Sequence, residues 1–300
     1  MEPVNVGIIG LGNVGSGTVE ILWNNWEQNT QKLGFPLWLR AICSRRLDNK
    51  TLPAGMERVI RTTDWREVVT NPEIDIVCEL VGGTTVAREI IDASIANGKS
   101  VVTANKELMA LHGPAIWKRA GEANVNLAME ASVAGGIPIH TVLREGIAGD
   151  RLNALFGILN GTSNFILTEI EKRGADFQEV LAEAQRLGYA EADPTADVDG
   201  FDARSKLAIL AALAFGLSVP PGGIYTEGIR RITPFDFQYA QQLGYTIRLL
   251  CSARRDDGGL MLAVRPALLP SSTACSELVT WAMPTLTPIT DARRAKTRRK

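Results

Sequence analysis

The sequence predicts an α/β fold: a doubly wound parallel sheet followed by a second, α+β domain. Two observations support this prediction. Up to Met129, β-branched runs alternate with helical patterns, which is the rhythm of a parallel sheet covered by helices. The length of 300 residues also suggests about two domains.

The composition excludes several classes of protein. The chain is 45% hydrophobic and 22% charged, as in ordinary globular proteins, and its net charge of −1 gives no reason to expect nucleic acid or a membrane surface as a partner. No apolar stretch is long enough to span a membrane and no signal peptide is recognisable, so we expect a cytoplasmic enzyme. The cysteines form no CxxC or Cys/His cluster, which argues against zinc and disulfides; they are Cys43, Cys78, Cys251 and Cys275.

The first element is a strand from Val4 to Ile9, followed directly by a glycine motif and by a helix expected from about Val14 to Trp26. In this position GxGxxG favours a Rossmann-type dinucleotide site over a plain glycine turn. The first glycine permits the turn, the second permits close approach of a pyrophosphate, and the third allows helix–strand packing. The helix N-terminus supplies N–H groups for phosphate. The candidate cofactor-binding residues are Gly10, Gly12, Asn13, Val14 and Gly15.

The strand expected from Leu37 to Cys43 ends in Ser44-Arg45-Arg46 and not in an acid. An acid at this point would bind a ribose 2′-hydroxyl, whereas a guanidinium binds a 2′-phosphate. We therefore expect NADP, with NAD possible as a second cofactor and Arg45 as the contact. The alternative is that both arginines are solvated loop residues.

Two further strands, Ile74–Val81 and Ser100–Thr103, enclose a helix from Val86 to Asn97. Ligands of such sheets bind beyond the carboxyl ends of the strands. Thr103 and Lys106 stand at such an end and are cofactor-site candidates, although Lys106 could also be an ordinary lysine at a helix start.

A helix expected from Leu108 to Ala123 and a strand from Val125 to Met129 precede the small-residue loop 130–138. The exposed carbonyls of this loop could hold a monovalent cation or border the cofactor, or the loop could be an interdomain hinge. A helix is expected from Pro138 to Glu145, and for His140 within it we rank a packing role above a catalytic one.

The second half continues with a strand from Arg151 to Leu159, a polar turn at 160–164 that opens a helix, and later strands from Tyr245 to Ala253 and from Leu260 to Pro266. Its most unusual segment is 187–206, where five carboxylates precede Lys206. From Asp202 a helical pattern runs to Gly216, which places Asp202 and Lys206 on one helix face. The segment is either a pocket for a small amine-bearing substrate or an acidic surface loop.

These motifs together resemble the homoserine dehydrogenase family. The resemblance covers about residues 4–270 and rests on GLGNVGSG (10–17), VTANK (102–106), EASVAGGIPI (130–139), GILNGTSNFILT (157–168), LGYAEADPTADVDGFDARSK (187–206) and ITPFDF (232–237). It implies NAD(P)-linked interconversion of L-homoserine and L-aspartate 4-semialdehyde, in the synthesis of threonine, methionine and isoleucine.

The resemblance also implies roles for individual residues. Lys206 matches the proton donor, Asp202 the carboxylate beside it, and Lys106 a lysine between cofactor and substrate. Glu191 matches the group that binds the substrate amine, and Asp197 is a second substrate-binding candidate. A sodium ion is implied at the backbone carbonyls of Glu130, Val133, Gly135 and Ile137.

We expect a Rossmann domain at 1–135, a substrate and dimerisation domain at 136–270, and a disordered basic tail at 271–300. The family pattern ends after Pro270, without an ACT domain, so the second domain is expected to be C-terminally truncated. A homodimer is expected if the fold is complete enough. The alternative function is a catalytically impaired remnant that still binds dinucleotide. An aldehyde-oxidising dehydrogenase is rejected because no cysteine has a catalytic motif.

Overall fold

The computed structural model describes residues 2–47 and 52–272. The chain folds into two compact units, which we describe separately. Of the described residues, the first unit contains 2–47, 52–155, 204–224 and 253–261, and the second contains 156–203, 225–252 and 262–272. The domain boundaries expected from the sequence stay a prediction. Across the described ranges no helix is both long and apolar enough to cross a membrane.

The first unit is built on a six-stranded sheet with the order β3-β2-β1-β4-β5-β6, in which every neighbouring pair is parallel. This order confirms the predicted doubly wound sheet and is that of a Rossmann-type fold. The strands are β1 (Val4–Ile9), β2 (Leu37–Cys43), β3 (Ile60–Thr62), β4 (Ile76–Glu79), β5 (Ser100–Thr103) and β6 (Leu127–Ala128).

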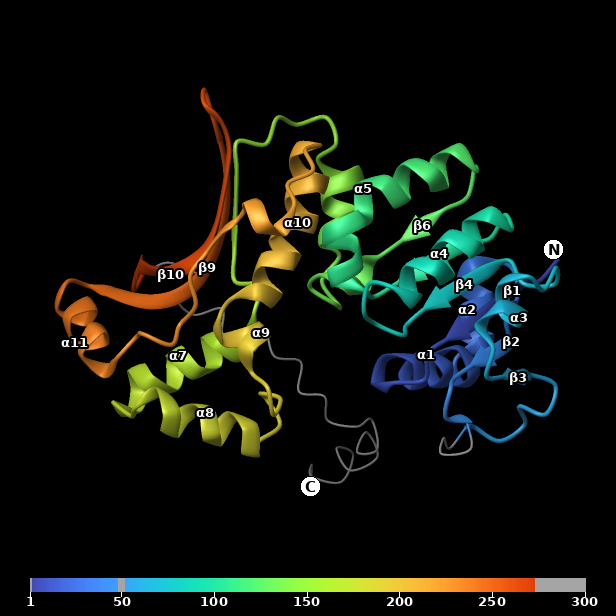
Figure 1. The fold of residues 1–300 in the computed structure, drawn as a ribbon, viewed down its shortest axis with the longest axis horizontal. Coiled ribbons are helices and arrows are strands. Elements are labelled where there is room, and N and C mark those ends of the chain that lie inside the picture. The colour runs from blue at the N-terminus through green and yellow to red at the C-terminus, as the bar shows by residue number, and fades with distance from the viewer. Residues whose placement is uncertain (1, 48–51, 273–300) are drawn as a thin grey trace, which may run out of the picture. The chain divides into compact units, whose positions relative to one another are not determined.

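Helices join these strands (Figure 1). The helix predicted from about Val14 to Trp26 ends at Asn24, because the chain leaves the helical conformation at Asn25 (φ −110°), and a second helix that the sequence analysis did not predict follows it. The helix predicted to start at Leu108 starts at Lys106, where Asn105 caps it. The helices are α1 (Asn13–Asn24), α2 (Trp26–Leu33), α3 (Trp65–Val69), α4 (Val86–Ala96) and α5 (Lys106–Glu122).

Apolar residues on both faces of the central strands form the core of this unit. Ile8, Ile42 and Val77, from three adjacent strands, are fully buried. Strands of a parallel sheet read as continuous apolar runs because helices cover both faces. This packing fixes where the polar loops at the carboxyl ends emerge.

The helix predicted from Pro138 to Glu145 is wrong in detail. After the short helix α6 (Ile139–Thr141) the chain widens into a π-helical turn, η3 (Val142–Gly146), in which the N–H of Ile147 donates to the carbonyl of Val142 at 3.0 Å. Such i→i+5 turns are rare and are not visible in a hydrophobic pattern.

A four-stranded sheet with the order β7-β9-β10-β8 follows. Strands β8 and β10 are parallel, whereas β9 and β10 are joined by a tight turn and neighbour each other, so the sheet is mixed. Strand β10 continues to Pro270, beyond the end at Pro266 that the sequence predicted. The strands are β7 (Ala154–Gly157), β8 (Tyr225–Thr226), β9 (Tyr245–Asp256) and β10 (Gly259–Pro270).

The helices of this half include a pair, α7 (Gly161–Arg173) and α8 (Phe177–Arg186), that lie side by side (Figure 1). Arg173 joins them through ion pairs with Glu179 and Glu183. Before Asp202 the acidic segment contains the one-turn helix α9 (Thr195–Val198). The remaining helices are α10 (Phe201–Phe215) and α11 (Pro234–Gln242).

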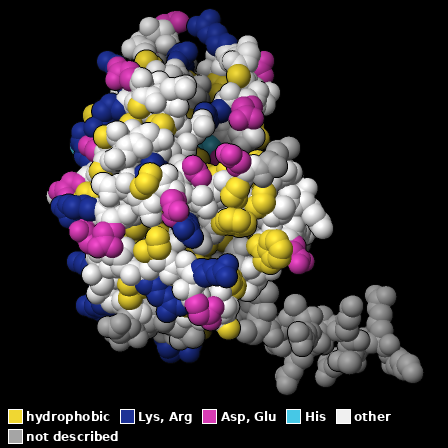
Figure 2. Space-filling view, turned by 90° about the vertical axis from the view of Figure 1, so that its right-hand side faces the viewer, with side chains coloured by type: hydrophobic (Ala, Val, Ile, Leu, Met, Phe, Trp, Pro, Cys, Tyr) yellow, Lys and Arg dark blue, Asp and Glu magenta, His cyan; other side chains and the backbone are white. Residues whose placement is uncertain are grey.

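On the face shown in Figure 2, basic and acidic side chains are interspersed with small apolar patches. No broad area of a single charge is visible among the described residues of that face. Of the basic tail predicted at 271–300, all residues after 272 lie outside the described part of the chain.

Candidate functional site

The glycine loop after β1 is constrained at its two ends. Gly10 has φ +105°, and a Cβ there would lie 2.4 Å from the carbonyl oxygen of Leu80. A Cβ on Gly15 would lie 1.9 Å from the carbonyl oxygen of Gly10. Gly12 differs, because no described atom lies within 4 Å of the position its Cβ would take. Two glycines are therefore required by packing, and the middle one leaves space for a ligand.

The loop leads into the N-terminus of α1, whose N-cap is Gly12. Among the described residues no side chain caps this helix, so the N–H groups of Asn13 and Val14 have no side-chain acceptor from a cap. Uncapped N–H groups at the positive end of a helix dipole form an anion site. The loop thus fits a pyrophosphate.

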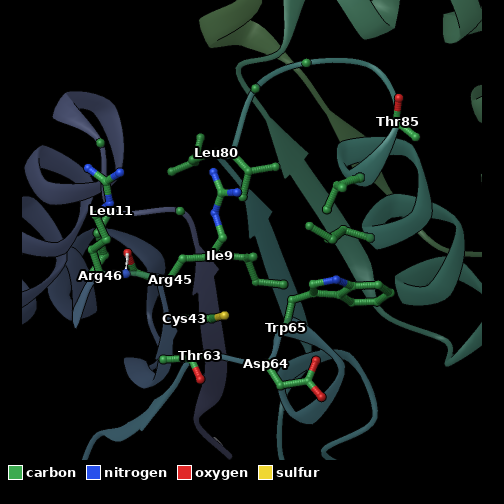
Figure 3. Close-up of a pocket in the computed structure, with 18 of the residues that line it drawn as sticks. Ile9, Leu11, Cys43, Arg45, Arg46, Thr63, Asp64, Trp65, Leu80 and Thr85 are labelled. Atoms are coloured by element: carbon green, nitrogen blue, oxygen red, sulfur yellow. Dashed lines mark hydrogen bonds between the residues drawn. The ribbon is translucent and has the colours of Figure 1, made fainter.

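A cavity of about 1020 Å³ adjoins this loop. Its walls are the segments that follow β1, β2, β3 and β4 (Figure 3). Strand order reverses between β1 and β4, and ligands of open α/β sheets bind at this switch point. The cavity is therefore where a dinucleotide is expected in this topology.

The wall that follows β2 is basic. Arg45 and Arg46 are both exposed and line the cavity (Figure 3). Ser44, which follows the last residue of this strand, accepts a hydrogen bond from the N–H of Arg46 at 3.4 Å. The carboxylate of Asp64, also in the wall, caps α3 by accepting from the N–H of Arg66 at 3.0 Å. The donors in this wall fit a 2′-phosphate.

A buried network joins the carboxyl ends of β4 and β5. Glu79 is fully buried; one carboxylate oxygen accepts from the N–H of Val81 at 2.9 Å and the other accepts from the hydroxyl of Thr103 at 2.7 Å. The Thr103 oxygen in turn accepts from the N–H of Asn105 at 3.0 Å. The Asn105 amide donates to the carbonyl of Gly83 at 2.6 Å. The candidate Thr103 thus holds the cavity loop in place through this network.

Lys106 is the first residue of α5 and is exposed. Asn105 caps the helix by accepting from the N–H of Leu108 at 3.0 Å. It follows the carboxyl end of β5, the side of a parallel sheet on which ligands bind, so Lys106 stays a candidate for the site.

The loop expected to hold sodium is a tight turn. Ala134 and Gly136 both have positive φ, at 53° and 88°. Of the expected ligands, Glu130 lies in the 3₁₀ turn η2 (Glu130–Ser132), Val133 is buried, and the carbonyl of Ile137 already accepts from the N–H of Ile139 at 2.7 Å. No group of three or more His, Cys, Asp or Glu side chains within the described ranges could hold a metal, so a cation here would depend on carbonyl oxygens.

His140, beside this loop, is 4% exposed, and its backbone N–H donates to the carboxylate of Glu130 at 3.3 Å. Burial lowers the pKa of its imidazole, against the opposing effect of Glu130. The buried neutral ring agrees with the packing role expected from the sequence.

In the second unit Asn160 brings two predicted site residues together. Its amide nitrogen lies 2.7 Å from Oδ1 of Asp197 and 2.9 Å from Oδ2 of Asp202. Asp202 is 8% exposed. Lys206 follows Asp202 by one turn of α10, as the spacing predicted.

The other acids of this segment have different surroundings. Glu191 is exposed, and its backbone carbonyl accepts from Gln185 at 3.0 Å. Asp199 is held by Arg230 through two hydrogen bonds of 2.6 and 3.2 Å. Hydrogen bonds from Thr195, and also the charge of Arg230, lower the pKa of Asp193. Asp197 and Asp202 thus belong to the Asn160 cluster, Asp199 is ion-paired, and Asp193 accepts from the N–H of Thr195.

Sequence reasoning missed Glu79, Asn160 and Arg230 as parts of these sites. A glutamate at the end of an apolar strand is a recognisable signal, because such a residue is seldom buried without a partner. The sequence around Asn160 indicates only a polar turn that opens a helix. Nothing in the sequence around Arg230 predicts a role in the site.

Two family models match the chain. One described as the homoserine dehydrogenase NAD binding domain matches residues 10–130, and one described as homoserine dehydrogenase matches residues 138–282. The second match continues past Pro270, where the sequence pattern was expected to stop.

The chain is 50% identical over 271 residues to the homoserine dehydrogenase of Pseudomonas aeruginosa, a match that covers 90% of this chain and 62% of that protein. A homoserine dehydrogenase structure from Thiobacillus denitrificans matches with TM-score 0.87 and 49% identity, over 91% of this chain and 63% of that chain. A structure of a putative homoserine dehydrogenase from Archaeoglobus fulgidus matches with TM-score 0.81 and 31% identity, over 91% and 86%.

A hyperthermophilic archaeal homoserine dehydrogenase mutant in complex with NADPH matches with TM-score 0.76 and 26% identity, over 91% of this chain and 84% of that chain. This chain spans about 62% of the length of the curated relatives it matches.

The parallel sheet, the glycine loop and the cavity at the switch point define a protein with a Rossmann-type nicotinamide-dinucleotide unit, followed by a mixed-sheet unit with an acidic site. The matched models cover both parts in sequence order. The chain belongs to the homoserine dehydrogenase family.

Proposed function

We propose that the protein interconverts L-homoserine and L-aspartate 4-semialdehyde with a nicotinamide dinucleotide, in the synthesis of threonine, methionine and isoleucine. The main support is that the amide of Asn160 bonds to both Asp197 and Asp202, and that Asp202 lies one helical turn before Lys206 on α10. A small substrate that carries both an ammonium and a reacting oxygen needs such a combination of acids and a nearby amine.

The carboxylates recognise the substrate. Asp197 and Glu191 bind its α-ammonium through charge-assisted hydrogen bonds, which are about twice as strong as neutral ones. Asp202 lies one turn before Lys206 on the same face of α10, so its negative charge orients the lysine side chain toward the substrate.

Lys206 exchanges the proton. When bound, the nicotinamide supplies hydride exchange with carbon 4 of the substrate. During reduction of the aldehyde, Lys206 stabilises the negative charge that develops on the carbonyl oxygen and gives that oxygen a proton; during oxidation it takes the proton of the hydroxyl. Lys106 orients the reacting groups, and much of the rate comes from holding them together.

The preferred cofactor is NADP. The guanidinium of Arg45 in the cavity wall supports this choice, since it can bind a 2′-phosphate with paired donors. The archaeal relative that holds NADPH gives independent support. The bound dinucleotide rests on Gly10, Gly12, Asn13, Val14 and Gly15, with Thr103 fixing the adjacent loop.

We further propose that a sodium ion binds the carbonyls of loop 130–138 and orders it. The positive φ angles of Ala134 and Gly136 support this, because they curl the backbone of the loop tightly. We also propose a homodimer formed through the second unit and a cytoplasmic location.

The test is an assay of the purified chain at 340 nm with L-homoserine and NADP, and with L-homoserine and NAD. We expect turnover with both cofactors, and at the same low cofactor concentration we expect a higher rate with NADP than with NAD. Dinucleotide binding by calorimetry without turnover would instead favour the impaired remnant, and absence of binding would contradict both functions.

A further inference from the structure

The carboxamide of Asn160 connects two carboxylates that the sequence separates from it by 37 and 42 residues. Both hydrogen atoms of its nitrogen are used, one for Asp197 at 2.7 Å and one for Asp202 at 2.9 Å. Asn160 itself is 3% exposed. The amide is therefore an internal element of the acidic site and does not reach solvent.

The orientation of this amide is set by the fold. Its oxygen accepts from the N–H of Ser163 at 2.8 Å and so caps α7. Because the oxygen must face the helix, the nitrogen must face the carboxylates, and the two cannot be exchanged. The segments that carry the two acids, α9 and the start of α10, adjoin this end of α7 (Figure 1).

An amide suits this place for an electrostatic reason. Two carboxylates within reach of one nitrogen repel each other, and each needs a donor. Arg or Lys would satisfy them but would also neutralise them and compete with a cationic substrate. A neutral NH₂ group provides one donor to each acid and leaves the negative charge of the pair intact.

We propose that Asn160 is a positioning residue: it holds Asp197, which binds the substrate ammonium, at a fixed spacing from Asp202, which lies beside Lys206 on α10. This inference rests on the proposed function. It predicts that changes at Asn160 weaken the binding of L-homoserine while the cofactor site in the first unit is unaffected.

The test uses Asn160→Ser, which keeps a hydroxyl that caps α7 but cannot bridge two acids. Because hydrogen bonds to charged groups contribute about 1.5–3 kcal/mol, we expect KM for L-homoserine to rise at least about tenfold. KM for NADP should stay close to that of the wild type, whereas the melting temperature should fall, because Asp197 and Asp202 each lose a donor. Asn160→Asp keeps the cap and the size, but adds a third carboxylate, so its KM for L-homoserine should rise further.

Asn164→Ser is the matched control. Asn164 is equally buried on α7; its side chain bonds to β9 through the N–H and carbonyl of Leu249 at 2.9 and 3.3 Å and also donates to the backbone carbonyl of Asn160 at 3.0 Å. Asn164→Ser therefore removes a backbone contact of Asn160 but leaves the bonds of the Asn160 amide to the two acids. We expect this variant to lower the melting temperature without a selective rise in KM for L-homoserine. This pattern separates positioning from simple loss of stability.

A double-mutant cycle with Asp197→Asn keeps the inference testable if a single variant folds poorly. Since Asn160 acts through Asp197, Asn160→Ser should raise KM less in the Asp197→Asn background than alone. An unchanged KM in both Asn160 variants, or strictly additive effects, would overturn the proposal.

If the wild type does not turn over L-homoserine, calorimetry of L-homoserine binding replaces KM. Weaker binding by the Asn160 variants than by the wild type upholds the proposal, and absence of binding to the wild type overturns it.

Discussion

The hydroxyl of Thr103 donates a 2.7 Å hydrogen bond to the carboxylate of Glu79, across 24 residues of sequence. Both side chains are fully buried at the carboxyl ends of adjacent strands. Since the other Glu79 oxygen holds the N–H of Val81, the pair fixes the loop that lines the cofactor cavity. A buried carboxylate with two donors is stable only while both remain.

We therefore predict that Thr103→Val lowers the free energy of unfolding by about 1–3 kcal/mol, because Glu79 and the N–H of Asn105 each lose a partner. Dinucleotide affinity should fall as well, since the cavity loop is less fixed. Urea unfolding and calorimetric titration measure the two effects. Thr70→Val, an exposed change at the end of α3 whose hydroxyl bonds to the Arg66 carbonyl, is the control. Unchanged stability in Thr103→Val would contradict this account.

Much of the first unit could be predicted from local sequence. The bounds of β2 and β5 agree with the expected ones, because short apolar runs between turn residues define buried strands directly. The helix after Pro138 could not be predicted in detail, since an i→i+5 turn has no periodic signature. The second helix at 26–33 was not predicted, since its sequence is mostly polar and gives no clear apolar period.

The site could be predicted where its residues are neighbours in sequence, and not where folding joins distant segments. Gly10, Gly12 and Gly15 and the Asp202–Lys206 spacing are local patterns. The hydrogen bonds between Asn160 and Asp197 and between Thr103 and Glu79 depend on how strands and helices pack, so residue spacing in the sequence cannot predict them. The site assignments themselves stay predictions, which the following variants test.

Lys206→Ala should lower kcat by at least about a hundredfold, as is typical when a general acid is lost. The affinity for NADP should persist, because the glycine loop and Arg45 are unaltered. Stopped-flow or steady-state rates with L-homoserine, together with NADP binding, provide the comparison. Lys172→Ala, an exposed lysine on α7, controls for the loss of a surface charge. Near-normal turnover in Lys206→Ala would exclude this lysine as the proton donor.

Arg45→Ala should weaken the binding of NADP more than that of NAD, because only NADP carries the 2′-phosphate. A charged hydrogen bond of this kind contributes about 1.5–3 kcal/mol, so NADP affinity should fall about tenfold or more. Calorimetric titration with both cofactors gives the ratio, and Arg46→Ala, its neighbour in the cavity wall, is the matched variant. Equal weakening of both cofactors by Arg45→Ala would mean that Arg45 does not read the phosphate.

Buried thiols should make stability depend on alkaline pH. Burial raises the pKa of Cys78 from 9.0 to about 12, and burial, with smaller effects of Asp64 and Glu67, raises the pKa of Cys43 from 9.0 to about 11. The folded chain thus keeps protons that the unfolded chain releases above pH 9. Their contribution is complete below the unfolded pKa and is lost as pH rises through the folded pKa values. Urea unfolding should show a smaller free energy of unfolding at about pH 10 than at about pH 8. The fall should be shallower in Cys78→Ala, and an identical slope in that variant would refute the assignment.

Gly12→Ala and Gly15→Ala should separate cofactor binding from folding within one motif. A methyl group on Gly15 would meet the carbonyl oxygen of Gly10 at 1.9 Å, so the turn cannot keep its shape and this variant should lose both stability and binding. A methyl group on Gly12 meets no described atom within 4 Å, and the φ of −74° suits alanine, so the fold should persist. It should nevertheless fill the space through which a pyrophosphate approaches, and thereby abolish most NADP affinity. Thermal unfolding and NADP titration of the two variants form the test. If Gly12→Ala binds NADP as well as the wild type, the pyrophosphate does not pass over this glycine.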